Sequence, residues 1–220
     1  IQIGIPIARI ELLVDVQMDA INKYSGLDYP AKSTLFLEFH GSDHSVKEQA
    51  EMVQDLASEN GGGDFQFATS TEDRSKLWQA RHDAAHSCNA LRPGCVLWAT
   101  DVCVPISRLA ECIHETKKDL ATASMPAPLV GHVGDGNFHL CFIIDPDKPE
   151  EMAEAQTLNG RLIDRALDMD GTCTGEHGVG LGKIAYMERE HGEGISVMRA
   201  IKKTLDPDNI MNPGKIISMN

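Results

Sequence analysis

The chain has 220 residues, 42% of them hydrophobic, and its 33 acidic and 20 basic side chains give a formal net charge of −13. This hydrophobic content is enough to bury one good core, which excludes a disordered chain. The acidic charge argues against nucleic acids and anionic lipid surfaces as partners, because the lysines and arginines are scattered and form no basic patch that would attract phosphates.

The cysteines and the apolar runs exclude two further classes of protein. The six cysteines show neither CxxC spacing nor the density of a small disulfide scaffold, so we expect reduced thiols. No apolar stretch approaches the roughly 20 residues that a membrane-spanning helix needs, so we expect no transmembrane segment.

In chain order, the first half of the sequence predicts alternating helices and strands. Apolar residues recur at helical intervals from 7 to about 24, and Gly26 follows as a helix stop. A mostly apolar strand is expected next, then a helix that ends at three glycines, a short strand with alternating phenylalanines, and a longer helix. Their ranges are 33–41, 45–60, 64–69 and 71–90.

The second half of the sequence predicts three more strands and then only helices. A strand at 95–104 and a helix at 105–123 precede two strands, 129–133 and 138–144, around a tight turn. Helices follow at 151–169, 180–190 and 194–205, before an irregular tail at 206–215. We therefore expect an α+β fold, a ferredoxin-like antiparallel sheet covered on one face by helices in residues 1–148, followed by a helical C-terminal segment in residues 149–220.

The segment 131–139, GHVGDGNFH, contains the most informative pattern. Asp135-Gly136 is a strong signal for a two-residue hairpin loop between apolar runs. With these two residues as the loop, His132 falls opposite His139, and directly opposed residues have Cβ atoms about 4.5–5.5 Å apart. Two imidazoles at that separation can bind one divalent cation.

A second glycine-rich segment, 171–183, supplies a third candidate ligand. Its acid–base pair, Glu176-His177, stands among glycines that let the backbone approach a ligand closely. The carboxylate of Glu176 would complete a His2Glu set with His132 and His139. Such a set leaves open positions for substrate and suits Zn2+ or Mn2+.

Simpler interpretations of both segments stay open. The two histidines could be only a hydrogen-bonded polar pair across a hairpin, and the glycine-rich loop could be only a tight turn. Nucleotide phosphate binding is rejected for both glycine patterns. Ile184 stands where a P-loop requires Ser or Thr, and the Gly134-Asp-Gly136 pattern lies in a hairpin rather than between a strand and a helix.

Four motifs occur in one order along the chain: LWQAR (77–81), GHVGDGNFH (131–139), GEHGVG (175–180) and DPDNIMNPGK (206–215). Together they resemble the C-terminal region of FAD-linked oxidases, the family that holds D-lactate dehydrogenase (cytochrome), the glycolate oxidase flavin subunit and D-2-hydroxyglutarate dehydrogenase. The resemblance covers essentially the whole chain. It implies a two-part enzyme, in which an N-terminal FAD-binding domain outside these 220 residues meets a substrate-binding cap, residues 1–148, and the helical segment.

The resemblance also implies roles for individual residues. His132, His139 and Glu176 would hold Zn2+ or Mn2+, His177 would be the catalytic base, Arg81 would pair with the substrate carboxylate, Asn137 would touch the substrate, and Asn212 would reach the flavin. The residues alone leave alternatives for three of these. Arg81 could be a surface salt-bridge partner of the acids between Asp73 and Asp83, Asn137 could be only a turn residue, and Asn212 could belong to a C-terminal turn.

The implied reaction is the oxidation of a D-2-hydroxy acid, with hydride transfer to FAD and electrons passed to a cytochrome or another carrier. Relatives that accept a dicarboxylate carry an extra basic residue on the strand after the arginine-bearing helix, whereas this strand, 96–101, is VLWATD. D-lactate is therefore the expected substrate, with glycolate second and 2-hydroxyglutarate as a further alternative.

Three other expectations complete this interpretation. The resemblance implies a mitochondrial location, and the 220 residues alone are expected to be inactive because the flavin is bound mainly outside them. A metal-dependent hydrolase, in which the same cation activates water, and a non-catalytic cap remain the alternatives of another class.

Overall fold

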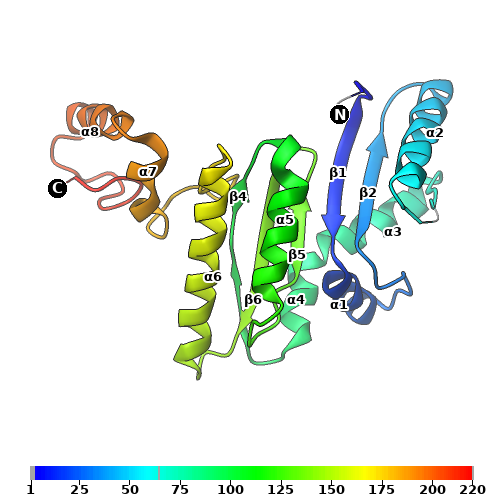
Figure 1. Ribbon diagram of the computed structural model, residues 1–220, viewed down its shortest axis with the longest axis horizontal. Coiled ribbons are helices and arrows are strands. Elements are labelled where there is room, and N and C mark those ends of the chain that lie inside the picture. Colours follow the sequence, from blue (N-terminus) through cyan, green and yellow to red (C-terminus); the bar gives the residue numbers. More distant parts are fainter. Residues whose placement is uncertain (1–2, 64, 220) are drawn as a thin grey trace.

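The computed structural model describes residues 3–63 and 65–219. Its strands form one antiparallel sheet in the order β2-β1-β5-β6-β3, with β4 also paired to β6 (Figure 1). The strands are β1 Ile7–Leu13, β2 Thr34–Phe39, β3 Val96–Ala99, β4 Val102–Cys103, β5 Leu129–His132 and β6 Asn137–Ile144. The predicted α+β class with an antiparallel sheet is confirmed.

Helices fill most of the remaining described chain. They are α1 Asp15–Ser25, α2 Asp43–Glu59, α3 Thr71–His82, α4 Ala84–Leu91, α5 Ile106–Leu120, α6 Pro149–Asp168, α7 Met187–His191 and α8 Gly194–Leu205, with a 3-10 turn, η1, at Ile184–Tyr186. No helix in residues 3–63 and 65–219 combines the length and the apolar character that crossing a membrane requires.

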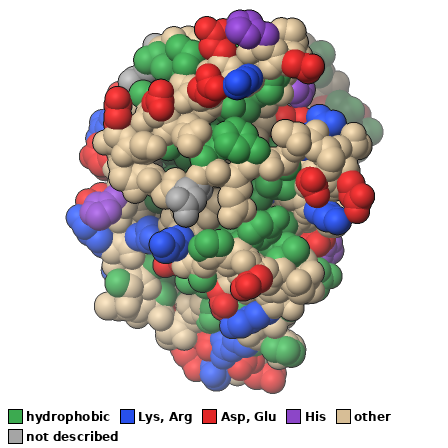
Figure 2. Space-filling view, turned by 90° about the vertical axis from the view of Figure 1, so that its right-hand side faces the viewer, with side chains coloured by type: hydrophobic (Ala, Val, Ile, Leu, Met, Phe, Trp, Pro, Cys, Tyr) green, Lys and Arg blue, Asp and Glu red, His purple; other side chains and the backbone are tan. Residues whose placement is uncertain are grey.

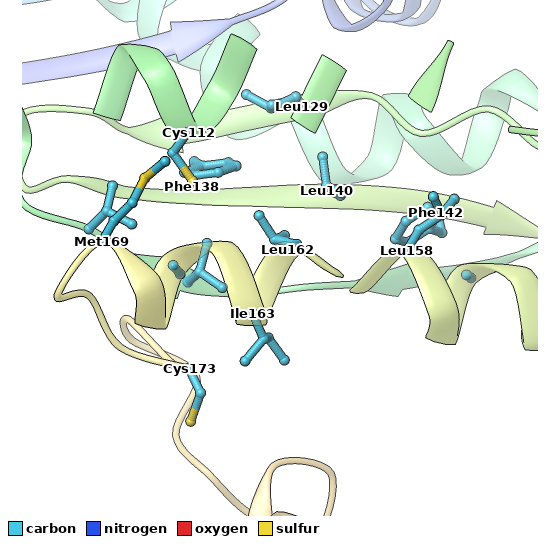
Figure 3. Close-up of a cluster of buried hydrophobic side chains, with 14 of the residues drawn as sticks. Cys112, Leu129, Phe138, Leu140, Phe142, Leu158, Leu162, Ile163, Met169 and Cys173 are labelled. Carbon is cyan, nitrogen blue, oxygen red and sulfur yellow. The ribbon is translucent and has the colours of Figure 1, made fainter. Parts of the chain in front are cut away.

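Helices cover both faces of the sheet, which corrects the expectation of one covered face. All eight residues of β6 are buried, so this strand contacts a core on each side. Phe138, Leu140 and Phe142 point into the larger core with α5 and α6 (Figure 3). Cys141 and Ile143 point the other way, into a second core that includes side chains of α1, α3 and α4.

The predicted helix at 7–24 is wrong in its first half, where the chain forms β1. This strand pairs with β2 on one side and β5 on the other. Its apolar residues happen to recur at helical spacing, but pairing with strands distant in sequence overrides that local signal. Helix α1 begins only after Val14, which is extended at φ −80° and ψ 170°, and it ends at Gly26 as predicted.

Several other predicted elements are interrupted in the structure. Residues 65–69 are irregular rather than a strand, and Asp64 lies outside the described residues. The predicted helix at 71–90 is divided into α3 and α4 at Asp83, and the predicted helix at 180–190 is a turn followed by η1 and α7. The predicted strand at 95–104 is divided into β3 and β4, and this break places Asp101 at the candidate site described below.

The predicted register of the β5–β6 hairpin is also wrong. His132 lies opposite Asn137, and Val130 lies opposite His139, so the loop has four residues rather than two. The observed pairing is shifted by two residues from the predicted one, so that His132 and His139 are diagonal rather than direct neighbours. Because side chains alternate with a period of two, His132 and His139 still share one face of the sheet.

The end of the molecule that carries β2, α2 and α3 shows no concentration of positive charge (Figure 2). Acidic and basic side chains are interspersed there with separate apolar patches.

Candidate metal and catalytic site

Three of the predicted site residues converge on one point. Oε1 of Glu176 lies 3.2 Å from Nε2 of His132 and 3.1 Å from Nε2 of His139. The two rings meet edge to face with their centroids 5.7 Å apart. Ligand atoms of the three residues all lie within 4.8 Å of one another.

The second nitrogen of each imidazole faces a hydrogen-bond acceptor. Nδ1 of His139 lies 3.0 Å from the carbonyl oxygen of Thr100, and Nδ1 of His132 lies 2.8 Å from Oε1 of Glu11. Because a carbonyl oxygen and an ionised carboxylate only accept, each Nδ1 carries the proton in the neutral ring. Each Nε2 then presents its lone pair toward Glu176.

This donor set fits a divalent cation in type, and the two distances from Glu176 fit one in spacing. In this tautomer two imidazole lone pairs and a carboxylate oxygen face each other, and a cation would stabilise such an arrangement. Ligands at about 2.0–2.1 Å from a tetrahedral Zn2+ lie roughly 3.3 Å apart. The observed separations of 3.1 and 3.2 Å are close to that value.

Asp101 organises the loop that carries Glu176 and His177. The residue is 1% exposed, and its Oδ2 accepts hydrogen bonds from the consecutive backbone N–H groups of Gly175, Glu176 and His177 at 2.8, 3.0 and 2.9 Å. The Thr174 hydroxyl donates to the same oxygen at 2.6 Å. Successive N–H groups that converge on one anion form a compact backbone nest, so the loop bends around this carboxylate.

The charge of Asp101 is stabilised from several sides. Lys183 Nζ lies 3.8 Å from Oδ2 and also donates to the backbone carbonyl of Asp101. Burial alone would raise the pKa of Asp101, but the hydrogen bonds from the loop and from Asn137, together with the charge of Lys183, outweigh it and hold the pKa well below its usual value. Asp101 is therefore ionised at neutral pH.

Asn137 supports Asp101 from the other side. Its Nδ2 donates to Oδ1 of Asp101 and to the carbonyl of Val102, both at 2.8 Å. A Cβ atom on Gly175 would lie 1.9 Å from this nitrogen, so the loop packs directly on the amide. Asn137 is 5% exposed and begins β6, so it is not a turn residue. Contact between Asn137 and the substrate stays a prediction, because the hydrogen bonds of Asn137 described here are made to the protein itself.

His177 lies beside the three candidate ligands and is open to solvent. Its ring stacks on that of His139 with a centroid separation of 4.7 Å and an interplanar angle of 11°. Nε2 of His177 is 3.9 Å from Oε1 of Glu176, and the side chain is 48% exposed. A partly exposed imidazole next to a cation site can exchange a proton with a bound ligand.

Arg81 reaches the same site through Glu11. Its Nε and Nη2 donate to Oε2 of Glu11 at 3.1 and 3.0 Å. Its ion-pair partner is therefore Glu11 rather than one of the acids between Asp73 and Asp83, and its contact with the substrate carboxylate stays a prediction. Asn212 is not brought to this site. It lies in the exposed tail after α8, where its Oδ1 is 3.4 Å from Lys215 Nζ.

The surroundings of the two histidines shift their pKa values in opposite directions. Burial alone would raise the pKa of Glu11, but its hydrogen bond with His132 and the charge of Arg81 outweigh it and lower the pKa. The hydrogen bond to Glu11 raises the pKa of His132, whereas burial lowers the pKa of His139. His139 is therefore held in the neutral form that binds metals, and His132 has a charged partner that orients it.

The sequence motifs missed three residues of this site: Glu11, Asp101 and Lys183. A signal for the two acids was present, because each stands alone among apolar strand residues, where an unpaired charge is costly. Lys183 carries no such signal, because in the sequence it only ends the glycine-rich segment 171–183. Its part in holding Asp101 depends on a contact across 82 residues of sequence, which no local pattern contains.

Known proteins are similar to this chain along nearly all of its length. Residues 1–216 match the family described as FAD linked oxidases, C-terminal domain. Over 220 residues the chain is 51% identical to a zebrafish (Danio rerio) protein named "Probable D-lactate dehydrogenase, mitochondrial", covering all of this chain and 44% of that protein. It is 48% identical over 215 residues to "D-lactate dehydrogenase [cytochrome], mitochondrial" of Arabidopsis thaliana, covering 97% of this chain and 38% of that protein.

More distant similarities extend to another named activity and to solved structures. The chain is 31% identical to "Glycolate oxidase subunit GlcD" of Bacillus subtilis, covering 96% of this chain and 45% of that protein. Its fold is similar to 4-ethylphenol oxidase from Gulosibacter chungangensis, with a TM-score of 0.66 and 16% identity over 94% of this chain and 47% of the other. The chain thus spans less than half the length of each of these proteins.

Proposed function

Because the chain belongs to the family of FAD linked oxidases, C-terminal domain, we propose that it is the substrate- and metal-binding part of an FAD-dependent D-2-hydroxy-acid dehydrogenase. D-lactate is the proposed substrate and pyruvate the product. The observation that carries this proposal is the meeting of Glu176 with His132 and His139 beside His177. The names of the relatives at 51% and 48% identity support the choice of substrate.

Arg81, His177 and Asp101 have separate proposed roles in the reaction. Arg81 binds the substrate carboxylate with its two terminal nitrogens, since Nε and one edge of Nη2 are used on Glu11. His177 removes the proton of the substrate hydroxyl, because an imidazole can accept a proton at neutral pH. Asp101 keeps His177 and Glu176 in place through their backbone N–H groups.

Two groups bound from outside the chain would complete the site. When bound, the divalent cation held by His132, His139 and Glu176 would stabilise negative charge on the substrate hydroxyl, and FAD would accept the hydride from C2. Among the described residues, no glycine-rich loop joins a strand to a helix with the spacing that a nucleotide phosphate needs. Most contacts to FAD are therefore assigned to another part of the protein, with Asn212 as this chain's contribution.

We assign the contact with the FAD-binding part of the protein to the C-terminal segment, because this segment has an exposed apolar surface. Val197, Ile201 and Leu205 lie on one face of α8 and are 59%, 54% and 72% exposed. Ile210 and Met211, next to Asn212, are 77% and 54% exposed. A patch of this kind marks an interface. The FAD-binding part is its proposed occupant, because the matched relatives are more than twice as long as this chain.

The substrate is proposed to be a small monocarboxylate. The strand after the arginine-bearing helix carries no cation, and its continuation places the buried carboxylate of Asp101 beside the site. A second substrate carboxylate near Asp101 would be repelled. D-lactate is therefore placed first and glycolate second, with 2-hydroxyglutarate the weakest of the three.

The acceptor and the location follow from the names of the relatives. The names of the Danio rerio and Arabidopsis thaliana relatives both include "mitochondrial", and the second also includes "[cytochrome]". We propose that electrons pass from the flavin to a cytochrome or a similar carrier, and that the protein is mitochondrial.

The test uses the full-length protein. Anaerobic addition of D-lactate should bleach the visible absorption band of the oxidised flavin, faster than glycolate does, and a chelator should slow this bleaching. A colourless full-length protein that hydrolyses its substrate with the same cation would refute the proposal. Bleaching at an unchanged rate after metal removal would refute the metal's role alone.

A further inference from the structure

Glu11 is a buried carboxylate that joins two parts of the site. Its side chain is 6% exposed, and each of its oxygens binds a different partner. Oε1 lies 2.8 Å from Nδ1 of His132, and Oε2 accepts from Nε and Nη2 of Arg81 at 3.1 and 3.0 Å. One side chain thus contacts both a candidate metal ligand and the candidate carboxylate-binding group.

We propose that Glu11 is a positioning residue that fixes His132 for metal binding and Arg81 for substrate binding, so that the two subsites are held in register by one carboxylate. This inference rests on the proposed function, because it assigns a role within the same site. Glu11 touches neither the cation nor the substrate and acts only through its two neighbours.

The strand pairing places Glu11 where this role requires it. Leu12 pairs with Gly131 and Leu13 with Val130, so continuing the same antiparallel register places Glu11 directly opposite His132. Opposed residues share a sheet face with Cβ atoms about 4.5–5.5 Å apart. The contact between Glu11 and His132 is therefore imposed by the backbone of β1 and β5.

For His132, Glu11 decides which nitrogen faces the cation. A carboxylate at Nδ1 holds the proton there and leaves the lone pair of Nε2 directed at Glu176. His139 obtains the same tautomer from the neutral carbonyl of Thr100. The negative charge behind His132 makes that ring the stronger electron donor of the two, as carboxylate–histidine–metal arrangements do.

For Arg81, Glu11 decides which edge of the guanidinium is free. Both bonds run from the Nε–Nη2 edge to one oxygen, and the Arg81 side chain makes no other hydrogen bond within the described residues. The opposite edge, formed by the two terminal nitrogens, keeps two N–H groups that are parallel and suited to a carboxylate. Without Glu11, nothing in this network fixes the plane of the guanidinium.

The experiment compares Glu11→Gln with Glu38→Gln. Glu38 is a matched control on the neighbouring strand β2, because it also contacts an arginine and a histidine, Arg9 at 3.5 Å and His40 at 3.1 Å, outside the site. Metal-free full-length protein is titrated with Mn2+, and free Mn2+ is measured by electron paramagnetic resonance. Flavin reduction by D-lactate is then measured at saturating Mn2+.

Glu11→Gln should weaken Mn2+ binding about 10–100-fold, the usual loss when the partner of a ligating histidine is removed. At saturating Mn2+ its KM for D-lactate should remain raised while kcat recovers, because Arg81 is no longer held. Glu38→Gln should match the wild type in both measurements. A purely structural role for Glu11 would not separate KM from kcat in this way.

The other outcomes also decide the question. If Glu11→Gln binds Mn2+ and D-lactate like the wild type, the inference is overturned while the dehydrogenase function stands. If the wild type binds no Mn2+ yet reduces its flavin with D-lactate, the inference fails together with the metal site. Should Glu11→Gln not fold, Glu11→Asp, which keeps the charge but shortens the side chain, must show weakened Mn2+ binding for the inference to survive.

Discussion

Replacing Asp101 with Asn should weaken the hydrogen bonds that hold the loop carrying Glu176 and His177, while leaving the size of the side chain at position 101 nearly unchanged. The carboxylate accepts on Oδ2 from three backbone N–H groups and a hydroxyl, and on Oδ1 from Asn137. An amide can present its oxygen to only one of these groups of donors. Its NH2 must then face a donor on the other side.

The expected loss can be worked out from these contacts. With the amide oxygen toward the loop, the 2.8 Å bond from Asn137 is replaced by two opposed donors, and the remaining bonds lose their charge. Hydrogen bonds to charged groups contribute about 1.5–3 kcal/mol and neutral ones about 0.5–1.5 kcal/mol. Asp101→Asn should therefore destabilise the protein by about 2–5 kcal/mol and weaken Mn2+ binding, since Glu176 is no longer placed between the histidines.

The pH dependence gives this prediction a second check. Because the pKa of Asp101 is lowered in the folded protein, its contribution is fully present above its unfolded pKa of about 3.9 and is lost as the pH falls below that value. The gap in unfolding free energy between wild type and variant should be constant from about pH 5 to 7 and should narrow in more acidic solution.

The assays are urea unfolding at several pH values and Mn2+ titration, with Asp206→Asn as the control. Asp206 is also a buried carboxylate that caps a loop, accepting from the backbone N–H groups of Ile210 and Met211 at 3.0 Å each. The control should lose stability without losing Mn2+ affinity. An Asp101→Asn protein with wild-type stability and wild-type Mn2+ affinity would show that the loop does not depend on this carboxylate.

Three further outcomes follow from single contacts. Gly175→Ala should abolish Mn2+ binding in a titration, because its Cβ would lie 1.9 Å from Asn137 Nδ2, whereas Gly182→Ala, with nothing within 4 Å, should bind normally. Phe138→Ala should lower the free energy of unfolding, measured in urea, by about 3–5 kcal/mol, since this side chain is fully buried in the core that the sheet forms with α5 and α6; a loss below about 1 kcal/mol would contradict that packing. The hydrogen bond from Arg92 and the backbone N–H of Asp145 lower the pKa of Glu151 to about 2, so the stability that Glu151 contributes should be present above about pH 4.3 and lost on acidification through about pH 2. The midpoint temperature of thermal unfolding of Glu151→Gln should therefore lie below that of the wild type at pH 6 and coincide with it near pH 2. A difference in midpoint temperature that is the same at every pH would refute this assignment.

The elements that the sequence predicted well are those whose signals are local. Helix α8 was placed correctly at both ends, 194 and 205, because its apolar residues follow one helical face. Strand β1 was mistaken for a helix because its ladder comes from β2 and β5, and the β5 partners lie more than 100 residues away. The hairpin register was wrong because the Asp135-Gly136 signal does not show that Val133 and Gly134 also leave the ladder.

The candidate site was predictable where chemistry is concentrated in motifs and unpredictable where it is shared between strands. His132, His139, Glu176 and His177 were found from two glycine-rich segments, and the register error did not separate them because a shift of two keeps the same face. Glu11 was missed, since a single acid in a strand has no meaning until its opposite neighbour is known. The ion pair between Arg81 and Glu11 was missed for the same reason.

The charges around the site suggest an order for binding. Glu11, Asp101 and Glu176 are three carboxylates, and Arg81 and Lys183 are two cations, so with neutral histidines this group carries one net negative charge. An anionic substrate would be repelled by it. A divalent cation changes the net charge to plus one, and one monocarboxylate then neutralises it, whereas a dicarboxylate would restore a negative charge to a partly buried site, which is costly. For the proposed substrate D-lactate, the metal is therefore expected to bind first, and the same charge balance would disfavour 2-hydroxyglutarate.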